Sequence, residues 1–309
     1  MFELRRLRLL HELALRGTLS AVAEALSYSP STISQQLAQL EKEAGVPLFA
    51  PDGRRVRLTE HGMMLAAHAE RALDLDERAR AELESLDVAG PGGAGAGAAG
   101  IAPTTVRVAV LQTAVPSVLP DAMTLLSRRA PRVRLEVAQV PPEEGLFELS
   151  ARRFDLVIAE QYPGHTRAHR AGLEREVLGV DPIRLALPPD DPATELAGLR
   201  DRAWIMEPEG TAARQWATQQ CRAAGFEPDV RFEIADLTAH VRLIAAGHAV
   251  GVLPDLVWAG GVPGVRLVDL PGAPARELFT AARESSTDRP SIRSVRDALR
   301  DGFHAALAG

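Results

Sequence analysis

Cysteine is almost absent from this chain of 309 residues, and Cys221 is its only example. No disulfide can therefore form within one chain. The sequence also lacks an apolar run long enough to span a bilayer, and Met1–Arg6 carries no apolar stretch of secretory length. These absences argue against a disulfide-rich secreted domain and against a membrane protein. We expect a cytoplasmic protein with no membrane partner.

Signatures of catalysis and of metal binding are missing as well. No serine stands in a Gly-x-Ser-x-Gly elbow, and the pair His165 and His169 lies in an Arg-rich segment that is better explained as solvated. Gly95-x-Gly97-x-x-Gly100 matches the dinucleotide fingerprint, but it follows a predicted helix and precedes a strand, the reverse of the required order. Cys221 has no second cysteine to resolve an oxidised thiol. We predict no enzyme activity, no metal and no cofactor.

Acidic residues outnumber basic ones over the whole chain, but not near the N-terminus. The net charge is -6, whereas residues 1–62 hold eight Lys and Arg against seven Asp and Glu. The bases gather at Arg5, Arg6 and Arg8 and again at Arg54–Arg57. Because local patches govern contact with phosphates, the negative total does not exclude a nucleic-acid partner. The length favours one small and one larger domain.

Three helices are predicted before residue 45. The first spans Met1–Arg16, with one side formed by Leu4, Leu7, Leu10 or His11, and Ala14. Thr18 or Ser20 can cap the second, and Ser29 can cap the third, where Pro30 suits the first position. The apolar side chains of the second are Val22, Ala25 and Leu26, and those of the third are Ile33, Leu37, Leu40 and Ala44. Their spacings of three and four predict a shared core.

The opposite face of the third helix is small and polar. It carries Ser31, Thr32, Ser34, Gln35, Ala38 and Lys42. Short hydroxyl side chains allow close approach to phosphates, and a Gln amide can pair with an adenine edge in two places. Such a face is typical of a helix in the DNA major groove, although an ordinary helical hairpin with a solvated face has the same pattern.

A hairpin is predicted next, with its turn at Asp52-Gly53. Its second arm alternates basic and apolar residues, and arginines there would bind phosphates beside the groove with an affinity that falls as salt rises. Helices and hairpin together predict a DNA-binding winged helix-turn-helix. The candidate DNA-binding residues are Pro30, Ser31, Thr32, Ser34, Gln35, Arg54, Arg55 and Arg57.

In order and spacing, this region resembles the LysR-type transcriptional regulators. The motifs that carry the resemblance are Ser-x-Ser-Thr-Ile-Ser-Gln-Gln-Leu at Ser29–Leu37, Leu40-Glu41, Gly45–Phe49 and Leu58–Gly62. The resemblance implies a winged head, a long linker helix and a two-lobed effector domain built like a periplasmic binding protein. It also implies double-stranded promoter DNA, a small-molecule effector and RNA polymerase as partners of a homodimer or homotetramer.

A long helix is predicted after the hairpin, capped by Thr59 and running to about Leu86. Its heptad stripe is Leu65, Ala69, Ala72, Asp76, Ala79, Leu83 and Leu86. About 28 residues reach about 40 Å, which is too long to bury against one small domain. We expect the stripe to form the seam of a dimer. Ala89–Gly100 then has the Gly-rich composition of a flexible linker.

From Thr105 onward, strands and helices alternate, which predicts a parallel or mixed sheet with helices on both faces. The expected strands are Val106–Leu111, Val133–Val140, Asp155–Ala159, Ile183–Leu187, Ala203–Met206, Val230–Ile234, Val250–Leu253, Val265–Leu270 and Phe279–Arg283. The expected helices are Val115–Arg129, Glu144–Arg152, Thr211–Ala224, Leu237–Ala246 and Ser291–Ala306. The run Ile244–Pro254 resembles the effector domain of the same family. That resemblance implies two strands crossing between lobes, near Ala159–Pro163 and Gly261–Leu267.

The predicted fold class is α+β and α/β, in four parts. Residues 1–58 form a winged helix-turn-helix DNA-binding domain, 59–88 a dimerising linker helix, and 89–104 a Gly- and Ala-rich hinge. Residues 105–309 form the two-lobed effector-binding domain, with lobe I at about 105–160 and 267–309 and lobe II at about 161–266.

Effector-binding candidates follow the strands. Ligands of open α/β lobes gather at the carboxyl ends of strands and at helix N-termini. Residues in such places are Gln112, Thr113, Gly210, Thr211, Asp236, Thr238 and Pro254. Thr113 and Thr211 can donate to a ligand or can simply cap helices. Glu207 and Glu209 would favour an amine or a zwitterion if they face inward.

The sequence thus predicts a sequence-specific transcriptional regulator whose promoter binding is modulated by a small molecule bound between two lobes. The alternatives are a solute-binding receptor and an enzyme on a two-lobed α/β scaffold. The attached DNA-binding head and the missing export signal count against a receptor, and the missing catalytic motifs count against an enzyme.

Overall fold

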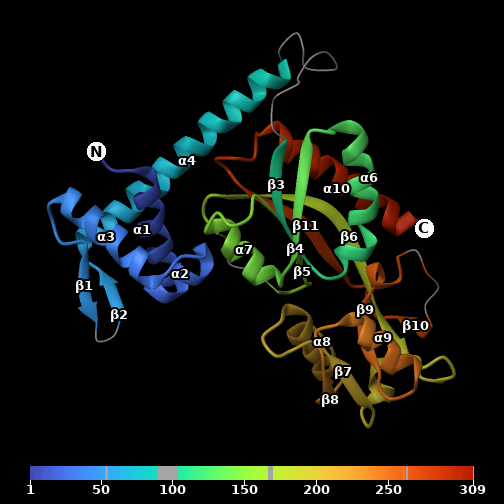
Figure 1. The fold of residues 1–309 in the computed structure, drawn as a ribbon. Coiled ribbons are helices and arrows are strands. Elements are labelled where there is room, and N and C mark those ends of the chain that lie inside the picture. Colours follow the sequence, from blue (N-terminus) through green and yellow to red (C-terminus); the bar gives the residue numbers. More distant parts are fainter. Residues whose placement is uncertain (53–54, 90–102, 166–169, 260, 262–263, 309) are drawn as a thin grey trace. The chain divides into compact units, whose positions relative to one another are not determined.

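The chain folds as two compact units in a computed structural model that describes residues 1–52, 55–89, 103–165, 170–259, 261 and 264–308 (Figure 1). The first unit contains Met1–Ala98 with Asp288–Pro290, and the second contains Ala99–Thr287 with Ser291–Gly309. Among the described residues, no helix combines the length and the apolar character that crossing a bilayer requires.

Three helices build the core of the first unit: α1 (Leu4–Arg16), α2 (Leu19–Leu26) and α3 (Pro30–Ala44). The predicted caps are present, because Thr18 Oγ1 accepts the Ala21 N–H at 3.2 Å and Ser29 Oγ accepts the Thr32 N–H at 3.1 Å. In α1 the prediction of Ala14 as a core residue is wrong: Leu13 is buried and Ala14 is exposed. The larger leucine side chain removes more apolar surface from water than alanine does.

A two-stranded wing follows, formed by β1 (Phe49–Asp52) and β2 (Arg55–Leu58). The strands are antiparallel, with Phe49 opposite Leu58 and Ala50 opposite Arg57. Glu41 of α3 holds the start of the wing, since its Oε1 accepts the backbone N–H of Leu48 at 2.7 Å and that of Phe49 at 3.1 Å. Gly53 of the predicted turn lies outside the described residues.

The long helix α4 spans Glu60–Ala89 and is capped as predicted by Thr59, whose Oγ1 accepts the Gly62 N–H at 3.0 Å. The predicted heptad stripe is packed against protein in its first part and exposed at Leu83 and Leu86. Its first part packs on the core of the helical head, namely Leu65, Ala69 and Ala72. The reason is that α1 covers this side of α4. The large apolar side chains left exposed on α4 are Met63, Met64, Leu75, Leu83 and Leu86.

The larger sheet of the second unit has the order β4-β3-β5-β11-β6. Its strands are β3 (Thr104–Val110), β4 (Val133–Gln139), β5 (Leu156–Gln161), β6 (Leu173–Leu187) and β11 (Ala275–Arg283). β3 is parallel to β4 and β5, and β11 is antiparallel to β5 and β6. Helices α6 (Leu119–Arg129) and α10 (Pro290–Ala308) pack on one face and α7 (Pro142–Ser150) on the other (Figure 1).

One predicted helix of this sheet layer is interrupted. Instead of a continuous Val115–Arg129, the structure has α5 (Ala114–Ser117) and then α6, which starts at Leu119. Pro120 stands in the first turn of α6, and a proline has no N–H with which to continue the hydrogen bonding of the preceding turn.

Strand β6 joins the two lobes of this unit. Its residues 173–182 pair with β11. On the other side of the crossing, Ile183–Ala186 pairs with β9 (Gly251–Pro254) and Arg184–Leu187 pairs with β10 (Arg266–Asp269). The chain therefore passes between lobes near residue 182 and returns between β10 and β11. The strand pairing thus places both crossings later in the chain than the expected positions near Ala159–Pro163 and Gly261–Leu267. Gly179 and Pro182 disfavour a strand locally, and only the partner strand β11 extends β6 to Leu173.

The smaller lobe continues from this pairing. β7 (Ala203–Met206) is parallel to β8 (Asp229–Glu233), and Trp204 of β7 forms a bridge with Val250, just before β9. Helices α8 (Ala212–Ala223) and α9 (Leu237–Ala245) follow β7 and β8, with short 3-10 turns at Leu196–Leu199 and Asp255–Trp258. The N-termini of α8 and α9 therefore follow the carboxyl ends of the two parallel strands.

Candidate functional site

Helix α3 leaves one polar side bare. Ser31, Ser34 and Gln35 are exposed, whereas Ile33, Leu37 and Leu40 are buried, as the spacing predicts. Pro30 is exposed at the first turn, and Thr32 is half-buried with its hydroxyl 2.8 Å from Ser29 Oγ. We call Pro30, Ser31, Thr32, Ser34 and Gln35 the recognition face.

The arginines beside the recognition face differ in their surroundings. Arg57 of β2 is exposed. Arg54 and the side chain of Arg55 lie outside the described residues. Arg6 is engaged within the head, because its guanidinium pairs with Glu43 and its Nε donates to Gln36 Oε1 at 3.2 Å.

Sequence reasoning missed one pair near the start of α3. Arg5 Nη2 donates to the hydroxyl of Tyr28 at 3.1 Å, and its guanidinium carbon lies 5.4 Å from the centroid of the Tyr28 ring. Tyr28 is two residues before Pro30, so this contact places a positive charge close to the N-terminal end of the recognition face. No local motif indicates this contact, because Arg5 and Tyr28 are 23 positions apart in the chain.

A buried ionic cluster stands where the lobes of the second unit meet. Arg276, only 2% exposed, donates from Nε and Nη2 to Asp181 Oδ2 at 2.9 and 2.7 Å, and it also pairs with Glu160. Its Nη2 donates to Thr113 Oγ1 at 2.7 Å. Asp181 Oδ1 accepts the Leu256 N–H at 3.0 Å. Four segments of the chain are thus connected through one guanidinium, which we call the Arg276 cluster.

Burial sets the protonation of this cluster. Desolvation would lower the pKa of Arg276, but Glu160 and Asp181 outweigh it and hold the pKa above its usual value. Burial raises the pKa of Asp181, and Arg276 opposes that rise. Burial, with a further contribution from Glu160, raises the pKa of the Tyr162 hydroxyl well above its ordinary value. Arg276 is therefore a permanent cation that is already matched by two carboxyl groups.

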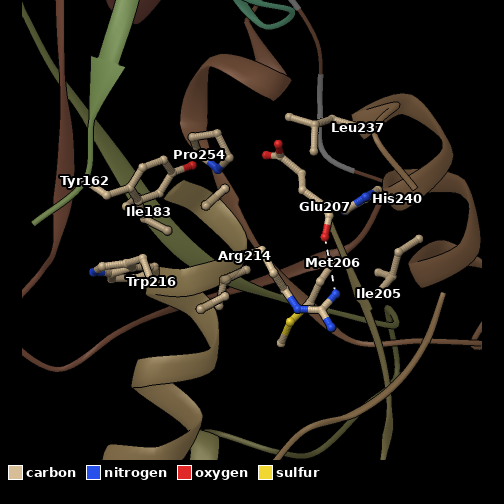
Figure 2. A pocket seen from close by; sticks show the side chains of 13 residues that line it. Tyr162, Ile183, Ile205, Met206, Glu207, Arg214, Trp216, Leu237, His240 and Pro254 are labelled. Carbon is tan, nitrogen blue, oxygen red and sulfur yellow. Dashed lines mark hydrogen bonds between the residues drawn. The ribbon is translucent and has the colours of Figure 1, made fainter. Parts of the chain in front are cut away.

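A pocket lies in the smaller lobe (Figure 2). It borders the Arg276 cluster, because the charges of Glu160 and Arg276 act on Tyr162 and Glu207 of its lining. Its lining is Tyr162, Ile183, Ile205, Met206, Glu207, Ala213, Arg214, Trp216, Ala217, Leu237, His240, Val252 and Pro254. The cavity is about 20 Å³, which is room for roughly one water molecule. Rings of Tyr162 and Trp216 form one wall, with centroids 5.8 Å apart. Most of the lining is apolar, as in ligand sites generally.

Glu207 is the carboxyl group of this pocket. It follows β7, and Figure 2 shows its side chain directed toward the Leu237 and Pro254 side, away from the guanidinium of Arg214. Burial raises its pKa to about 7, Glu160 adds to the rise, and Arg276 counteracts it. Of the two glutamates whose direction the sequence left open, Glu207 therefore faces the pocket, whereas Glu209 is exposed.

Two of the predicted effector residues meet across the lobes. Gln112, after β3, donates from Nε2 to Asp236 Oδ1 at 2.8 Å and accepts the Leu237 N–H with Oε1 at 3.3 Å. Asp236 also caps α9, accepting the Thr238 N–H at 2.9 Å. Gln112 therefore occupies the helix N-terminus that was expected to face a ligand. Thr113 is committed to Arg276.

The remaining predicted effector residues differ in their surroundings. Thr211 caps α8, since its Oγ1 accepts the Arg214 N–H at 3.2 Å and donates to the Pro208 carbonyl at 2.9 Å. Gly210 is exposed with φ +88°, and Thr238 is exposed on α9. Pro254 is the one predicted residue that lines the pocket. Sequence reasoning missed Tyr162, Trp216 and His240, which come from separate elements and share no local motif.

The lone thiol is unsuited to redox sensing. Cys221 is 1% exposed on α8, and burial raises its pKa to about 12. A thiol that stays protonated and inaccessible reacts slowly with oxidants. Among the described residues, no three His, Cys, Asp or Glu side chains are grouped as a metal site would need. His169 lies outside the described residues.

Family models match both parts of the chain. Residues 4–63 match the bacterial regulatory helix-turn-helix protein of the lysR family, and residues 101–304 match the LysR substrate binding domain. These two matches together cover the head, most of the second unit and the start of α4.

Individual proteins agree with the family models. The transcriptional dual regulator GltC of Bacillus subtilis is 27% identical over 266 residues, which are 84% of this chain and 83% of that protein. A full-length OxyR variant of Pseudomonas aeruginosa has the same fold, with a TM-score of 0.66 and 22% identity over 97% of this chain and 95% of that chain. CbnR, solved with its target DNA, gives a TM-score of 0.52 and 21% identity over 97% of this chain and 100% of that chain.

Proposed function

The chain belongs to the LysR family of bacterial transcriptional regulators, and from this premise we propose how its two units regulate a promoter. The first unit binds a specific DNA sequence, with α3 in the major groove and the wing against the adjacent phosphates. The second unit binds a small-molecule effector. GltC is named as a transcriptional regulator, which favours regulation over the alternatives of an enzyme or a solute-binding receptor.

The bare side of α3 is the observation that carries the DNA-binding part of the proposal. Ser31, Ser34 and Gln35 are exposed on a helix whose other side is anchored in the core by Ile33, Leu37 and Leu40. A firmly packed helix can present an amide and short hydroxyls to base edges and phosphates in a fixed geometry. In this proposal Pro30 and Thr32 set the start of the helix, and Arg54, Arg55 and Arg57 bind phosphates.

We propose a homodimer or homotetramer that acts on a partly palindromic site in the cytoplasm, together with RNA polymerase. The exposed apolar side chains Leu75, Leu83 and Leu86 of α4 favour a helix partner. If two α4 helices pair, the two DNA-binding heads of the dimer would bind half-sites about one helical turn apart. The part of the chain at 59–88 then serves as the linker helix and residues 89–104 as the hinge.

Effector control is proposed to act through the two-lobed arrangement of residues 105–309. Gln112 and Asp236 connect the lobes, and the Arg276 cluster lies where β6 passes from one lobe to the other. A ligand that binds one arrangement of the lobes more tightly than the other shifts the population toward it. The proposed effector-contacting residues remain Gln112, Thr113, Gly210, Thr211, Asp236, Thr238 and Pro254, joined by the pocket lining.

Selection of random-sequence DNA by the intact protein tests the function. We expect a preferred site with two related halves, confirmed by footprinting of the selected sequence. The assay needs a stated salt concentration because phosphate contacts dominate affinity. Capture of DNA without any common sequence would contradict the proposal.

Gln35→Ala is expected to relax the choice of base at one position of each half-site. A bidentate contact to a base is worth about 1–3 kcal/mol of discrimination. The measurement is competition binding between the selected site and its single-base variants. Gln219→Ala, an exposed glutamine of α8, is the matched control and should leave the preference unchanged. If Gln35→Ala discriminated between bases as well as the natural chain does, Gln35 would have no role in base recognition.

Arg57→Ala is expected to weaken binding to all sequences alike. Loss of one phosphate contact lowers the slope of log K against log salt by about one. Titrations of the selected site and of an unrelated duplex at several salt concentrations measure this slope. A loss confined to the selected site would assign Arg57 to base recognition instead.

A further inference from the structure

The pocket beside the Arg276 cluster has walls suited to an apolar group. Tyr162 and Trp216 stand with their ring planes 39° apart, and Ile183, Val252 and Pro254 complete that side. Tyr162 is 4% and Trp216 3% exposed, so both rings are packed within the protein and scarcely contact solvent. Aromatic faces carry a negative potential that attracts cations as well as apolar groups.

The carboxyl group of Glu207 lacks a partner inside this apolar setting. Within the described residues it makes no hydrogen bond and no ion pair, although it is half-buried and borders the cavity. An acid in such a place usually pairs with a base, because desolvation of an unpaired carboxylate is costly. Glu207 is therefore an unmatched acid directed into a cavity.

The nearby bases are already engaged. Arg276 is shared by Glu160 and Asp181. Arg214 donates from Nη1 to the Glu207 carbonyl oxygen at 3.2 Å and lies 3.8 Å from Glu233 Oε2. Burial lowers the pKa of His240, and its Nε2 donates to the Ile234 carbonyl at 2.7 Å. The carboxyl groups of Glu160, Asp181, Glu207 and Glu233 thus stand near the pocket with only the two guanidinium groups of Arg276 and Arg214 to match them, so carboxyl groups outnumber arginines there.

We propose that this pocket selects a small organic cation, a protonated primary amine on a branched or aromatic apolar body. The ammonium group pairs with the Glu207 carboxylate, and the apolar body lies against Tyr162 and Trp216. This rests on the proposed effector function and adds the chemical class of the effector. Because the cavity holds about one water, an amine must displace lining groups, which links its binding to a change in the smaller lobe.

The pH dependence follows from the charges around Glu207. The titratable and charged groups around it are Glu160, Tyr162, Asp181, Arg214, His240 and Arg276. With a pKa of about 7, Glu207 is largely protonated at pH 6 and ionised at pH 8. A cation binds the ionised form, so its affinity should rise about tenfold from pH 6 to pH 8.

Three probes with one carbon skeleton separate charge from shape. They are 3-methylbutylamine, 3-methylbutan-1-ol and 3-methylbutanoate, titrated into the intact protein by calorimetry and followed by tryptophan fluorescence. We expect the amine to bind at least about tenfold more tightly than the other two at pH 8. Glu207→Gln should abolish this preference and its pH dependence. Glu209→Gln, the same change at an exposed neighbour, should retain both.

Two results would overturn the proposal. One is tighter binding of the carboxylate or the alcohol than of the amine, which would assign the pocket to an anion or a neutral ligand. The other is binding of none of the three. In either case, DNA selection with the same protein tests the regulatory function independently. A preferred DNA site without amine binding refutes only the proposed ligand class. The absence of any preferred DNA site refutes the regulatory function.

Discussion

Arg276→Met is expected to destabilise the second unit by about 3–5 kcal/mol, because it removes the only cation of a buried cluster while leaving the two carboxyl groups in place. Asp181 is fully buried and Glu160 is 7% exposed, so water does not replace the lost guanidinium. Thr113 also loses the donor to its hydroxyl. Thermal and urea unfolding, followed by circular dichroism, measure the change.

The deficit should depend on pH. Burial already raises the pKa of Asp181, and Arg276 counteracts this rise. Without Arg276 the folded-state pKa rises further, so the folded variant binds more protons than the unfolded chain between the two pKa values, and its stability increases as pH falls through that window. The deficit is therefore largest near neutral pH and smaller in mild acid.

Arg134→Met is the matched control for this experiment. Arg134 is an arginine of the same sheet whose side chain is 68% exposed, and its nearest carboxylate oxygen, on Glu136, is 3.5 Å away. Exposed substitutions of this kind change stability by about 0.5 kcal/mol or less. Equal losses for both arginines, or a deficit in Arg276→Met that grows as pH falls, would show that the buried charges are not the cause.

Gly62→Ala is expected to destabilise the helical head by about 3 kcal/mol, at the upper end for overpacking. A Cβ at this position would lie 2.2 Å from the Leu48 carbonyl oxygen, and that oxygen accepts the Thr59 N–H at 3.0 Å. The Leu48 N–H is held in turn by Glu41. The backbone at Leu48 therefore cannot move without breaking the bonds that join α3, the wing and α4.

The readout is the unfolding of the head together with its affinity for the selected DNA site. Gly198→Ala is the control, because a Cβ there meets no atom within 4 Å and the residue is exposed. Replacing such a glycine stabilises a protein slightly or leaves it unchanged. If both alanine variants unfolded at the same temperature as the natural chain, the close approach of α4 to Leu48 would be wrong.

Much of the head was predictable because its determinants are local. Ser29 and Pro30 start α3, Thr59 starts α4, and the spacing of Ile33, Leu37 and Leu40 defines the buried side. Each of these interactions joins residues within one or two helical turns, so it can be predicted from a short stretch of sequence. The prediction of a dimer seam on α4 was wrong for the first part of the helix, because this part depends on a contact with a distant segment. Ala69 and Ala72 suit a dimer seam and an intramolecular contact equally, and α1 occupies that side.

The candidate ligand pocket was only partly predictable. Pro254 was found because it ends a buried strand, and Gln112 and Asp236 because they stand next to helix starts. Their contact with each other, 124 residues apart in the chain, was not foreseen. Glu207 was noticed, but its direction depends on how β7 and α8 turn. The strand β6 was shortened in the prediction because Gly179 and Pro182 conceal a pairing with β11 that begins about 90 positions later.

The amino-acid order by itself determined the helix caps, the bare side of α3, the wing and the alternation of strands and helices, since these depend on neighbours within a few residues. Tertiary structure alone decided that Arg276 meets Thr113 across 163 positions, that Asp181 is fully buried against Arg276, and that the Glu207 carboxyl group borders the pocket unpaired. Burial and charge balance belong to the folded arrangement, because each depends on which distant strands exclude water from the same place.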